Sequence, residues 1–256
     1  MWNPVKRINT AIYNLGFFAR ILSGVGHFIR HHKASFKILI MQILFTFVFA
    51  LGITTLLAMA IGAAVFVIGE PFLSMLNQQQ LIFPLLIIII MRELGPLLTA
   101  FIVIARSATA IATEIAGMVI SHEVEAYISV GVDPIQHLAV PRFLGLITSL
   151  VLLNIYFSVF GLAGSFLVSQ FFSFTPVDLY FGSLLQHLTF RDVLLSLIKS
   201  ISFGAIISTV AVIKGFSVER ATTEVPVAGL RAVSGAFALC IFVNVLLSAL
   251  YYVVLS

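Results

Sequence analysis

The sequence predicts an all-α integral membrane protein of about five transmembrane helices. Of its 256 residues, 61% are hydrophobic and only 9% are charged, whereas a soluble globular chain carries roughly 25% charged residues. The apolar residues gather in five stretches, and each is long enough to cross a bilayer, which takes a helix of about 20 residues. These stretches must be helical, because an open strand would leave backbone groups unpaired in lipid.

The five apolar stretches form one predicted domain, residues 35–256. They cover residues 38–68, 81–105, 144–172, 193–213 and 233–255. The first stretch is too long for the core of a signal peptide, so we expect an uncleaved span. No internal repeat supports the inverted-repeat architecture of many secondary transporters.

The placement of positive charge predicts the orientation. Six Lys and Arg residues precede the first span, whereas the loops near 69–80 and 173–191 hold only Arg191 between them. Because cytoplasmic loops carry the excess of Lys and Arg, the N-terminus should be cytoplasmic and the C-terminus outside. An odd number of spans agrees with this orientation.

Residues 1–34 are predicted to hold an amphipathic interfacial helix. Apolar residues recur there at helical spacing: Ile8, Ile12, Leu15, Ala19 and Leu22. Polar residues fall on the opposite side: Lys6, Asn9, Arg20 and His27. Such a basic amphipathic helix suits the membrane interface, although Phe17 lies on the polar side; a solvated arm is the alternative.

A second short helix is expected outside the membrane, in the loop 176–187. Thr175 can cap this helix, and Pro176 suits its first turn.

Two adjacent charges, Arg92 and Glu93, lie in the middle of the second predicted span. A charge at the centre of a transmembrane helix costs roughly 2.5–3.5 kcal/mol on insertion scales. Neighbouring residues point about 100° apart on a helix, so this pair needs partners on other helices, water or a bound headgroup. It either joins helices or forms a polar wall of a substrate cavity. Pro96 lacks an N–H, so the carbonyl of Arg92 should lose its helical partner and a kink is expected.

Other residues of the spans are assigned simpler roles. Lys199 is expected to snorkel to the outer interface, with a cavity role as the alternative. Ala108, Ala112 and Ala116 form a stripe of small residues that lets helices pack closely.

Catalytic and metal-binding motifs are missing from the sequence. It holds no Gly-Lys pair and so no phosphate-binding loop, which means that the chain cannot be its own ATPase. The segment His122-Glu-Val-Glu-Ala126 has Ala where a zinc motif needs a second His. We therefore expect neither an enzyme nor a metal or cofactor site.

The cytoplasmic segment 122–134 is predicted to form a short amphipathic helix. The helix should end near Gly131, and Asp133-Pro134 should start the next turn. This segment is either a plain connection or a docking surface for a cytoplasmic motor.

Several of these residues form a pattern typical of a known family. The pattern is Arg92-Glu-Leu-Gly-Pro96, Arg106, Glu114, Met118, Glu123 to Tyr127, Gly131-Val-Asp-Pro134, Pro141-Arg142-Phe143, Lys199-Ser200, Phe203-Gly204 and Ala221-Thr222-Thr223. From about residue 35 onward the chain resembles the MlaE-type permeases of ABC transporters. The resemblance implies a homodimer in the bacterial inner membrane, with a periplasmic C-terminus and phospholipid as the substrate.

The resemblance also implies partners and site residues. A separate cytoplasmic ATPase would bind ATP and Mg²⁺ and engage the coupling segment 118–134. A periplasmic MCE-domain protein would receive or supply lipid, and a small STAS-type cytoplasmic subunit is a further candidate; no nucleic acid is implied. The implied coupling residues are Glu123, Glu125, Tyr127, Asp133 and Pro134. The implied lipid-cavity residues are Arg92, Glu93, Phe72, Leu73 and Leu76.

Two other function classes remain open from the sequence. A secondary transporter would need no ATPase, and a scaffold would only anchor an MCE protein without a transport cycle of its own.

Overall fold

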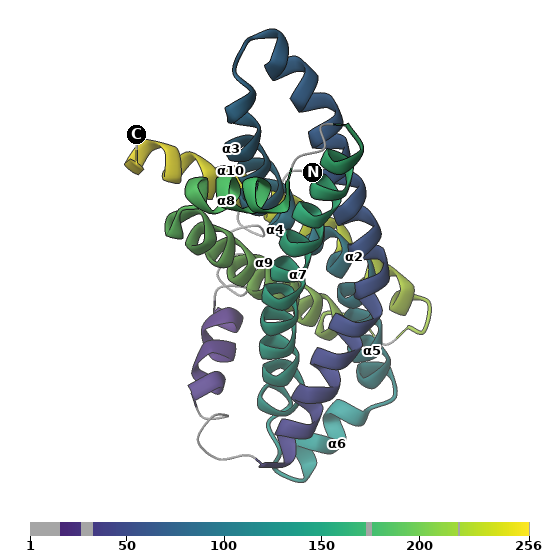
Figure 1. The fold of residues 1–256 in the computed structure, drawn as a ribbon. Coiled ribbons are helices and arrows are strands. Elements are labelled where there is room, and N and C mark those ends of the chain that lie inside the picture. The colour runs from purple at the N-terminus through teal and green to yellow at the C-terminus, as the bar shows by residue number, and fades with distance from the viewer. Residues whose placement is uncertain (1–15, 27–32, 173–175, 220, 256) are drawn as a thin grey trace, which may run out of the picture. The chain divides into compact units, whose positions relative to one another are not determined.

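The computed structural model describes residues 16–26, 33–172, 176–219 and 221–255. Within these ranges the regular structure is helical throughout (Figure 1). Five helical stretches there are long and apolar enough to cross a membrane: Ile38–Met75, Gln79–Ile120, Ile135–Phe171, Phe190–Phe216 and Glu224–Val253. The prediction of an all-α membrane protein with five spans is therefore confirmed.

The second and third spans extend well beyond their predicted ends. The second continues from α3 (Ile82–Leu86) through the π-helix η2 (Ile87–Leu94), α4 (Gly95–Val103) and η3 (Ile104–Ala108) into α5 (Thr109–Ile120). The third begins with η4 (Ile135–Ala139) and continues as α7 (Val140–Phe172). The single cation Arg106 does not end the helix, because small and apolar residues continue on both sides of it.

The remaining helices agree with the expected order. The first span lies in α2 (Lys33–Met75), the fourth in α9 (Phe190–Phe216) and the fifth in α10 (Glu224–Leu255). The coupling segment contains α6 (Glu123–Ser129), and α8 (Val177–His187) is the short helix expected after the third span. The N-cap residue of α8 is Pro176, so the expectation that Pro176 lies in the first turn was one residue off. Thr175 lies outside the described residues.

The chain divides into two compact units. One comprises Met1–Thr46, Val103–Thr148 and Gly204–Cys240, and the other Phe47–Ile102, Ser149–Phe203 and Ile241–Ser256. We call them the first and the second unit.

In the second unit, α2 and α7 pack backbone against backbone. A Cβ atom added to Gly62 would overlap the carbonyl oxygen of Gly161, and one added to Gly164 would lie 2.5 Å from the carbonyl oxygen of Met59. Small residues permit this approach, which is how helices gain contact area inside a membrane.

The core of the second unit also holds α8 in place. Tyr180 is fully buried there, and its ring packs edge-on against Phe83. Its hydroxyl lies 2.7 Å from Ser165 Oγ. Burial raises the pKa of Tyr180, although the hydrogen bond with Ser165 opposes this shift.

In the first unit, the alanine stripe, which runs from the end of η3 into α5, packs as predicted. Ala108, Ala112 and Ala116 are fully buried. A Cβ atom on Gly215 of α9 would lie 3.0 Å from the carbonyl oxygen of Ala112. The stripe therefore acts in helix packing.

The N-terminal helix Gly16–Gly26 turns an unexpected face to the first unit. Phe17, Ile21 and Gly24 are buried, whereas Leu22 of the predicted apolar face is exposed. Phe17 does not belong to a solvated face, because its ring packs 6.2 Å from that of Phe216. The exposed face remains available to lipid, so the interfacial location stays a prediction. Residues 1–15 and 27–32 lie outside the described part of the chain.

Candidate functional site

The charged pair Arg92 and Glu93 lies in η2 and takes its partners from α9, within the second unit. Arg92 Nη1 donates a hydrogen bond to Asp192 Oδ1 at 3.3 Å, and Lys199 Nζ donates one to Glu93 Oε2 at 2.7 Å. The direct separation from Arg92 Nε to Glu93 Oε1 is 4.0 Å. The expectation of partners on another helix is thus confirmed, and both partners share one face because they lie two helical turns apart.

Lys199 does not snorkel to the interface, so that expectation was wrong. Its side chain is fully buried, and Nζ also donates to Ser248 Oγ at 2.8 Å and to the carbonyl oxygen of Arg92 at 3.1 Å. That carbonyl is the one expected to lose its helical partner because of Pro96. Three acceptors offset the cost of burying the ammonium group, which is why Lys199 stays inside.

Arg92 is stacked against two aromatic rings of α10, and two of its nitrogen atoms donate no hydrogen bond to the described residues. Its guanidinium carbon lies 4.5 Å from the ring centroid of Tyr251 and 4.9 Å from that of Tyr252. The side chain is only 7% exposed, and among the described residues neither Nε nor Nη2 finds a hydrogen-bond acceptor. Buried donors of this kind normally have a partner, so the free edge of Arg92 is suited to an anion.

The two cations and two anions of this group sum to zero charge, and we call Arg92, Glu93, Asp192 and Lys199 the charge network. Glu93 is 28% exposed and is the member most open to the surroundings. The network therefore joins two helices, which is the first alternative for the Arg-Glu pair. Arg92 Nε and Nη2 still have no hydrogen-bond acceptor among the described residues. The network is therefore also compatible with the second alternative, a polar wall of a substrate cavity.

The three apolar residues predicted for the lipid cavity lie near the end of α2 and just beyond it. Phe72 and Leu76 are exposed, whereas Leu73 is buried in the core cluster with Phe66 and Ile82. Leu73 thus packs inside the protein, whereas Phe72 and Leu76 lie on its surface. The role of all three in a lipid cavity stays a prediction.

The coupling segment has the predicted helix and turn. Gly131 has a φ of +77°, a conformation that favours glycine, and it follows α6 closely. Asp133 Oδ1 accepts a hydrogen bond from the Ile135 N–H at 2.9 Å, and Pro134 is the N-cap residue of η4.

The residues predicted to meet an ATPase are mostly on the surface of this segment. Glu123 and Glu125 are exposed. Glu125 Oε2 lies 2.9 Å from His122 Nδ1. The ring of Tyr127 packs 5.3 Å from that of His137, which fixes the end of α6 against η4. The docking role of these residues stays a prediction.

Sequence reasoning missed Asp192, Ser248 and the two tyrosines. A signal for Asp192 was present, because it lies seven residues before Lys199 on one apolar span, which repeats an opposite-charge pair on one helix face. No comparable sequence signal marks Tyr251 and Tyr252, because aromatic residues are common at the ends of membrane helices.

Comparison with known proteins bears on this arrangement. Residues 39–250 match the family described as Permease MlaE. The chain is 29% identical over 216 residues to a probable ABC transporter permease protein of Rickettsia prowazekii, a match that covers 84% of this chain and 83% of the relative. It is 24% identical over 164 residues, 64% of this chain and 63% of the relative, to the intermembrane phospholipid transport system permease protein MlaE of Haemophilus influenzae. It is 32% identical over 120 residues, 47% of this chain and 34% of the relative, to the chloroplastic protein TRIGALACTOSYLDIACYLGLYCEROL 1 of Arabidopsis thaliana. With a family match over most of its length and five candidate spans, this multi-pass membrane protein belongs to the MlaE permease family.

Proposed function

We propose that the chain is the permease subunit of an ABC transporter that moves phospholipid, powered by a separate cytoplasmic ATPase. Membership of the MlaE permease family supports the transporter role. The Haemophilus relative is named for phospholipid transport, and the Rickettsia relative is named as an ABC permease. The observation that carries the proposal is the free, buried donor edge of Arg92 within a membrane-spanning unit.

The chemistry of this edge matches a phospholipid headgroup. A guanidinium group binds phosphate through two parallel N–H···O bonds, and such bonds are stronger in a site that excludes water. Arg92 is already oriented by Asp192 and the tyrosine rings, and its Nε and Nη2 make no hydrogen bond among the described residues. A phosphate could bind there without loss of the hydrogen bond at Nη1, and it would displace the Glu93 carboxylate, which lies 4.0 Å from Nε. Exposed Phe72 and Leu76 would supply apolar surface for acyl chains.

The proposed assembly follows from the family. Two copies of the chain form a homodimer in the bacterial inner membrane, with the N-terminus cytoplasmic and the C-terminus periplasmic. The ATPase binds ATP and Mg²⁺ and docks on the segment 118–134. A periplasmic MCE-domain protein exchanges lipid with the permease, and a STAS-type subunit accompanies the ATPase.

The test compares two substitutions of Arg92. Arg92→Lys keeps a cation for Asp192 but lacks the guanidinium fork, whereas Arg92→Ala strands the Asp192 carboxylate. We expect Arg92→Lys to assemble with the ATPase while it loses most of the co-purified phospholipid, and Arg92→Ala to lower the yield of the complex. Arg231→Lys at an exposed position is the matched control.

The outcome distinguishes the two alternatives for the charge network. Wild-type lipid content and transport in Arg92→Lys would remove Arg92 from the substrate site and leave it a helix-joining role. Docking is tested separately by Glu123→Lys with Glu125→Lys, which should weaken ATPase association through charge reversal while the chain still inserts.

A further inference from the structure

The charge network is neutral on its own, and this neutrality limits which headgroup it can accept. Arg92 and Lys199 supply the positive charges, and Glu93 and Asp192 supply the negative ones. The two cationic side chains are 7% and 0% exposed, so an unbalanced charge beside them is poorly screened by water. An anionic headgroup would leave the site with a net negative charge, whereas a zwitterionic headgroup would keep it neutral.

A phosphate bound to Arg92 would change the surroundings of Glu93. Arg92 Nε lies 4.0 Å from Glu93 Oε1, and Nε and Nη2 have no hydrogen-bond acceptor among the described residues. A phosphate on this edge would take the place of the Glu93 carboxylate, because two anions so close together repel each other. Glu93 would keep its hydrogen bond with Lys199 and lose the nearby positive charge of Arg92.

Glu93 has acceptor sites left for a replacement cation. A carboxylate group offers about four lone-pair sites. Lys199 Nζ lies 2.7 Å from Oε2, and the Ser248 hydroxyl lies 3.0 and 3.2 Å from the two oxygens. Since each donor directs a single hydrogen atom along such a bond, these contacts leave part of the carboxylate unused. Glu93 is also 28% exposed, so a donor from outside can reach it.

The tyrosine pair of α10 bears on the kind of ammonium group. Quaternary ammonium groups are recognised by cages of aromatic rings. Here the Arg92 guanidinium carbon already lies 4.5 Å from the ring centroid of Tyr251 and 4.9 Å from that of Tyr252. Arg92 thus occupies the place that a quaternary ammonium group would need. A primary ammonium group donates hydrogen bonds instead, which suits the unused acceptor sites of Glu93.

We propose that the charge network selects zwitterionic phospholipids with a primary ammonium group, with the phosphate on Arg92 and the ammonium on Glu93. In an ethanolamine headgroup a short linker joins the phosphate to the ammonium, so the two ends can contact neighbouring side chains. Each charge of the headgroup then meets an opposite charge, and the site stays neutral. This inference rests on the proposed function and names the class of phospholipid that the same site prefers.

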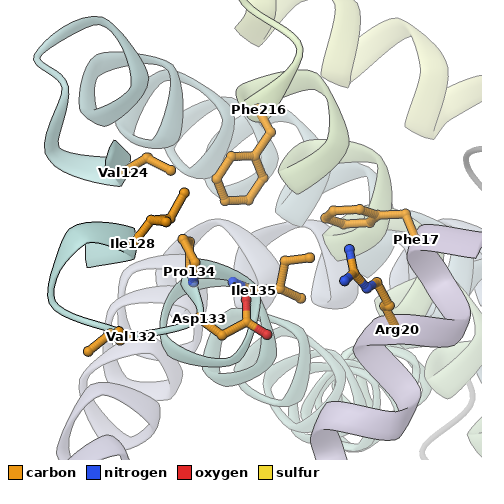
Figure 2. Close-up of a pocket in the computed structure, with 10 residues that line it drawn as sticks. Phe17, Arg20, Val124, Ile128, Val132, Asp133, Pro134, Ile135 and Phe216 are labelled. Carbon is orange, nitrogen blue, oxygen red and sulfur yellow. Dashed lines mark hydrogen bonds between the residues drawn. The ribbon is translucent and has the colours of Figure 1, made fainter. Parts of the chain in front are cut away.

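The first unit offers a matched control arginine. Arg20 lines an open groove of about 560 Å³ (Figure 2). The lining of this groove also includes two aromatic rings and a carboxylate, from Phe17, Phe216 and Asp133. Arg20 is exposed, however, and Asp133 Oδ1 already accepts a hydrogen bond from the Ile135 N–H at 2.9 Å. Water therefore screens Arg20, and its replacement should not alter the choice of headgroup.

The test measures which lipids the full-length chain binds in detergent. The purified protein is incubated with equal amounts of phosphatidylethanolamine, phosphatidylcholine and phosphatidylglycerol that carry identical acyl chains. It is then isolated again, and mass spectrometry quantifies the bound lipids. We expect the wild type to prefer the ethanolamine lipid by about tenfold over each competitor. Arg20→Gln should give the wild-type ratios.

Two variants separate a direct contact from an effect of overall charge. Glu93→Gln and Asp192→Asn each leave the network with one net positive charge, so both should bind more of the anionic lipid. Only Glu93→Gln removes the proposed acceptor of the ammonium group. It should therefore lose the preference for the ethanolamine lipid over the choline lipid, whereas Asp192→Asn should keep it.

The possible results also separate the inference from the function on which it rests. A wild type that binds all three lipids equally overturns the inference and leaves phospholipid transport intact. Wild-type ratios in Glu93→Gln, or an equal loss of the ethanolamine preference in Asp192→Asn, overturn it as well. Altered ratios in Arg20→Gln would place the selective site in the groove and equally overturn it. If the network variants do not fold, the wild-type ratios decide. A wild type that binds none of the three lipids contradicts the proposed function itself.

Discussion

Replacing Lys199 with Met tests the charge network most sharply, because the side chain keeps its length and loses only its charge and donors. Lys199→Met removes the hydrogen bonds to Glu93, Ser248 and the carbonyl oxygen of Arg92. Among its hydrogen bonds, Glu93 then keeps the Ser248 hydroxyl, at 3.0 and 3.2 Å from its two oxygens. The carboxylate would lose its closest cation and keep the more distant Arg92 Nε, at 4.0 Å.

The expected loss in the free energy of unfolding follows from the burial of Lys199 and Glu93. Removing one partner of a buried ion pair costs about 3–5 kcal/mol. Because Glu93 is 28% exposed, we expect the lower end, about 3 kcal/mol. The double variant Glu93→Gln with Lys199→Met removes both charges, so it should recover more than half of that loss.

The assay is denaturant unfolding of the purified protein in detergent for the wild type, both single variants and the double variant. Lys214→Met, in the last turn of the same helix, is the control and should stay within about 0.5 kcal/mol of the wild type. Losses that simply add in the double variant, or a Lys199→Met protein as stable as the wild type, would refute the contacts described here.

Further predictions concern packing, topology and pH. Gly62→Ala should cost about 1–3 kcal/mol or more, because the added methyl overlaps a backbone carbonyl, whereas Gly52→Ala on the same helix meets no atom within 4 Å and should fold normally; thermal unfolding compares them. A reporter fused after Ser256 should lie outside the cytoplasm, and one inserted near Val130 should be cytoplasmic. A cytoplasmic C-terminus would contradict the predicted orientation of the five spans. Because burial raises the pKa of Tyr180, its contribution to stability is present below pH about 10 and is lost as the pH rises through the raised pKa; Tyr180→Phe should flatten that alkaline loss in pH-dependent unfolding.

Hydropathy was sufficient to predict the number of spans, because length and apolar content decide whether a helix can cross a bilayer. It could not place the ends of the second span. Arg106 looked like a boundary, yet the alanine stripe that follows buries against α9 and keeps the helix continuous. Tertiary packing and the small, apolar residues on both sides of Arg106 together keep the helix continuous.

The candidate site was predictable only in part. The cost of two adjacent charges correctly demanded partners on another helix, and the missing N–H of Pro96 pointed to the Arg92 carbonyl, which accepts a hydrogen bond from Lys199. Neither argument could identify Lys199 as the donor for both, because a lysine near a span end can equally extend to the interface. The choice depends on which face of α9 meets η2, and a single sequence does not give that face.

The N-terminal helix shows a similar limit. Its periodicity identified one apolar face, but the face that contacts the protein is built from Phe17, Ile21 and the small Gly24. A glycine carries no hydrophobic signal in a sequence pattern, even where it allows the closest approach.

The most direct test of the account is movement of a labelled phospholipid by this chain reconstituted with its ATPase in liposomes. The account predicts that the wild type moves the lipid only when ATP is hydrolysed, and that Arg92→Lys lowers the rate by about tenfold or more while ATPase association is kept. Lipid movement that needs no ATP, or a wild-type rate in Arg92→Lys, would contradict it.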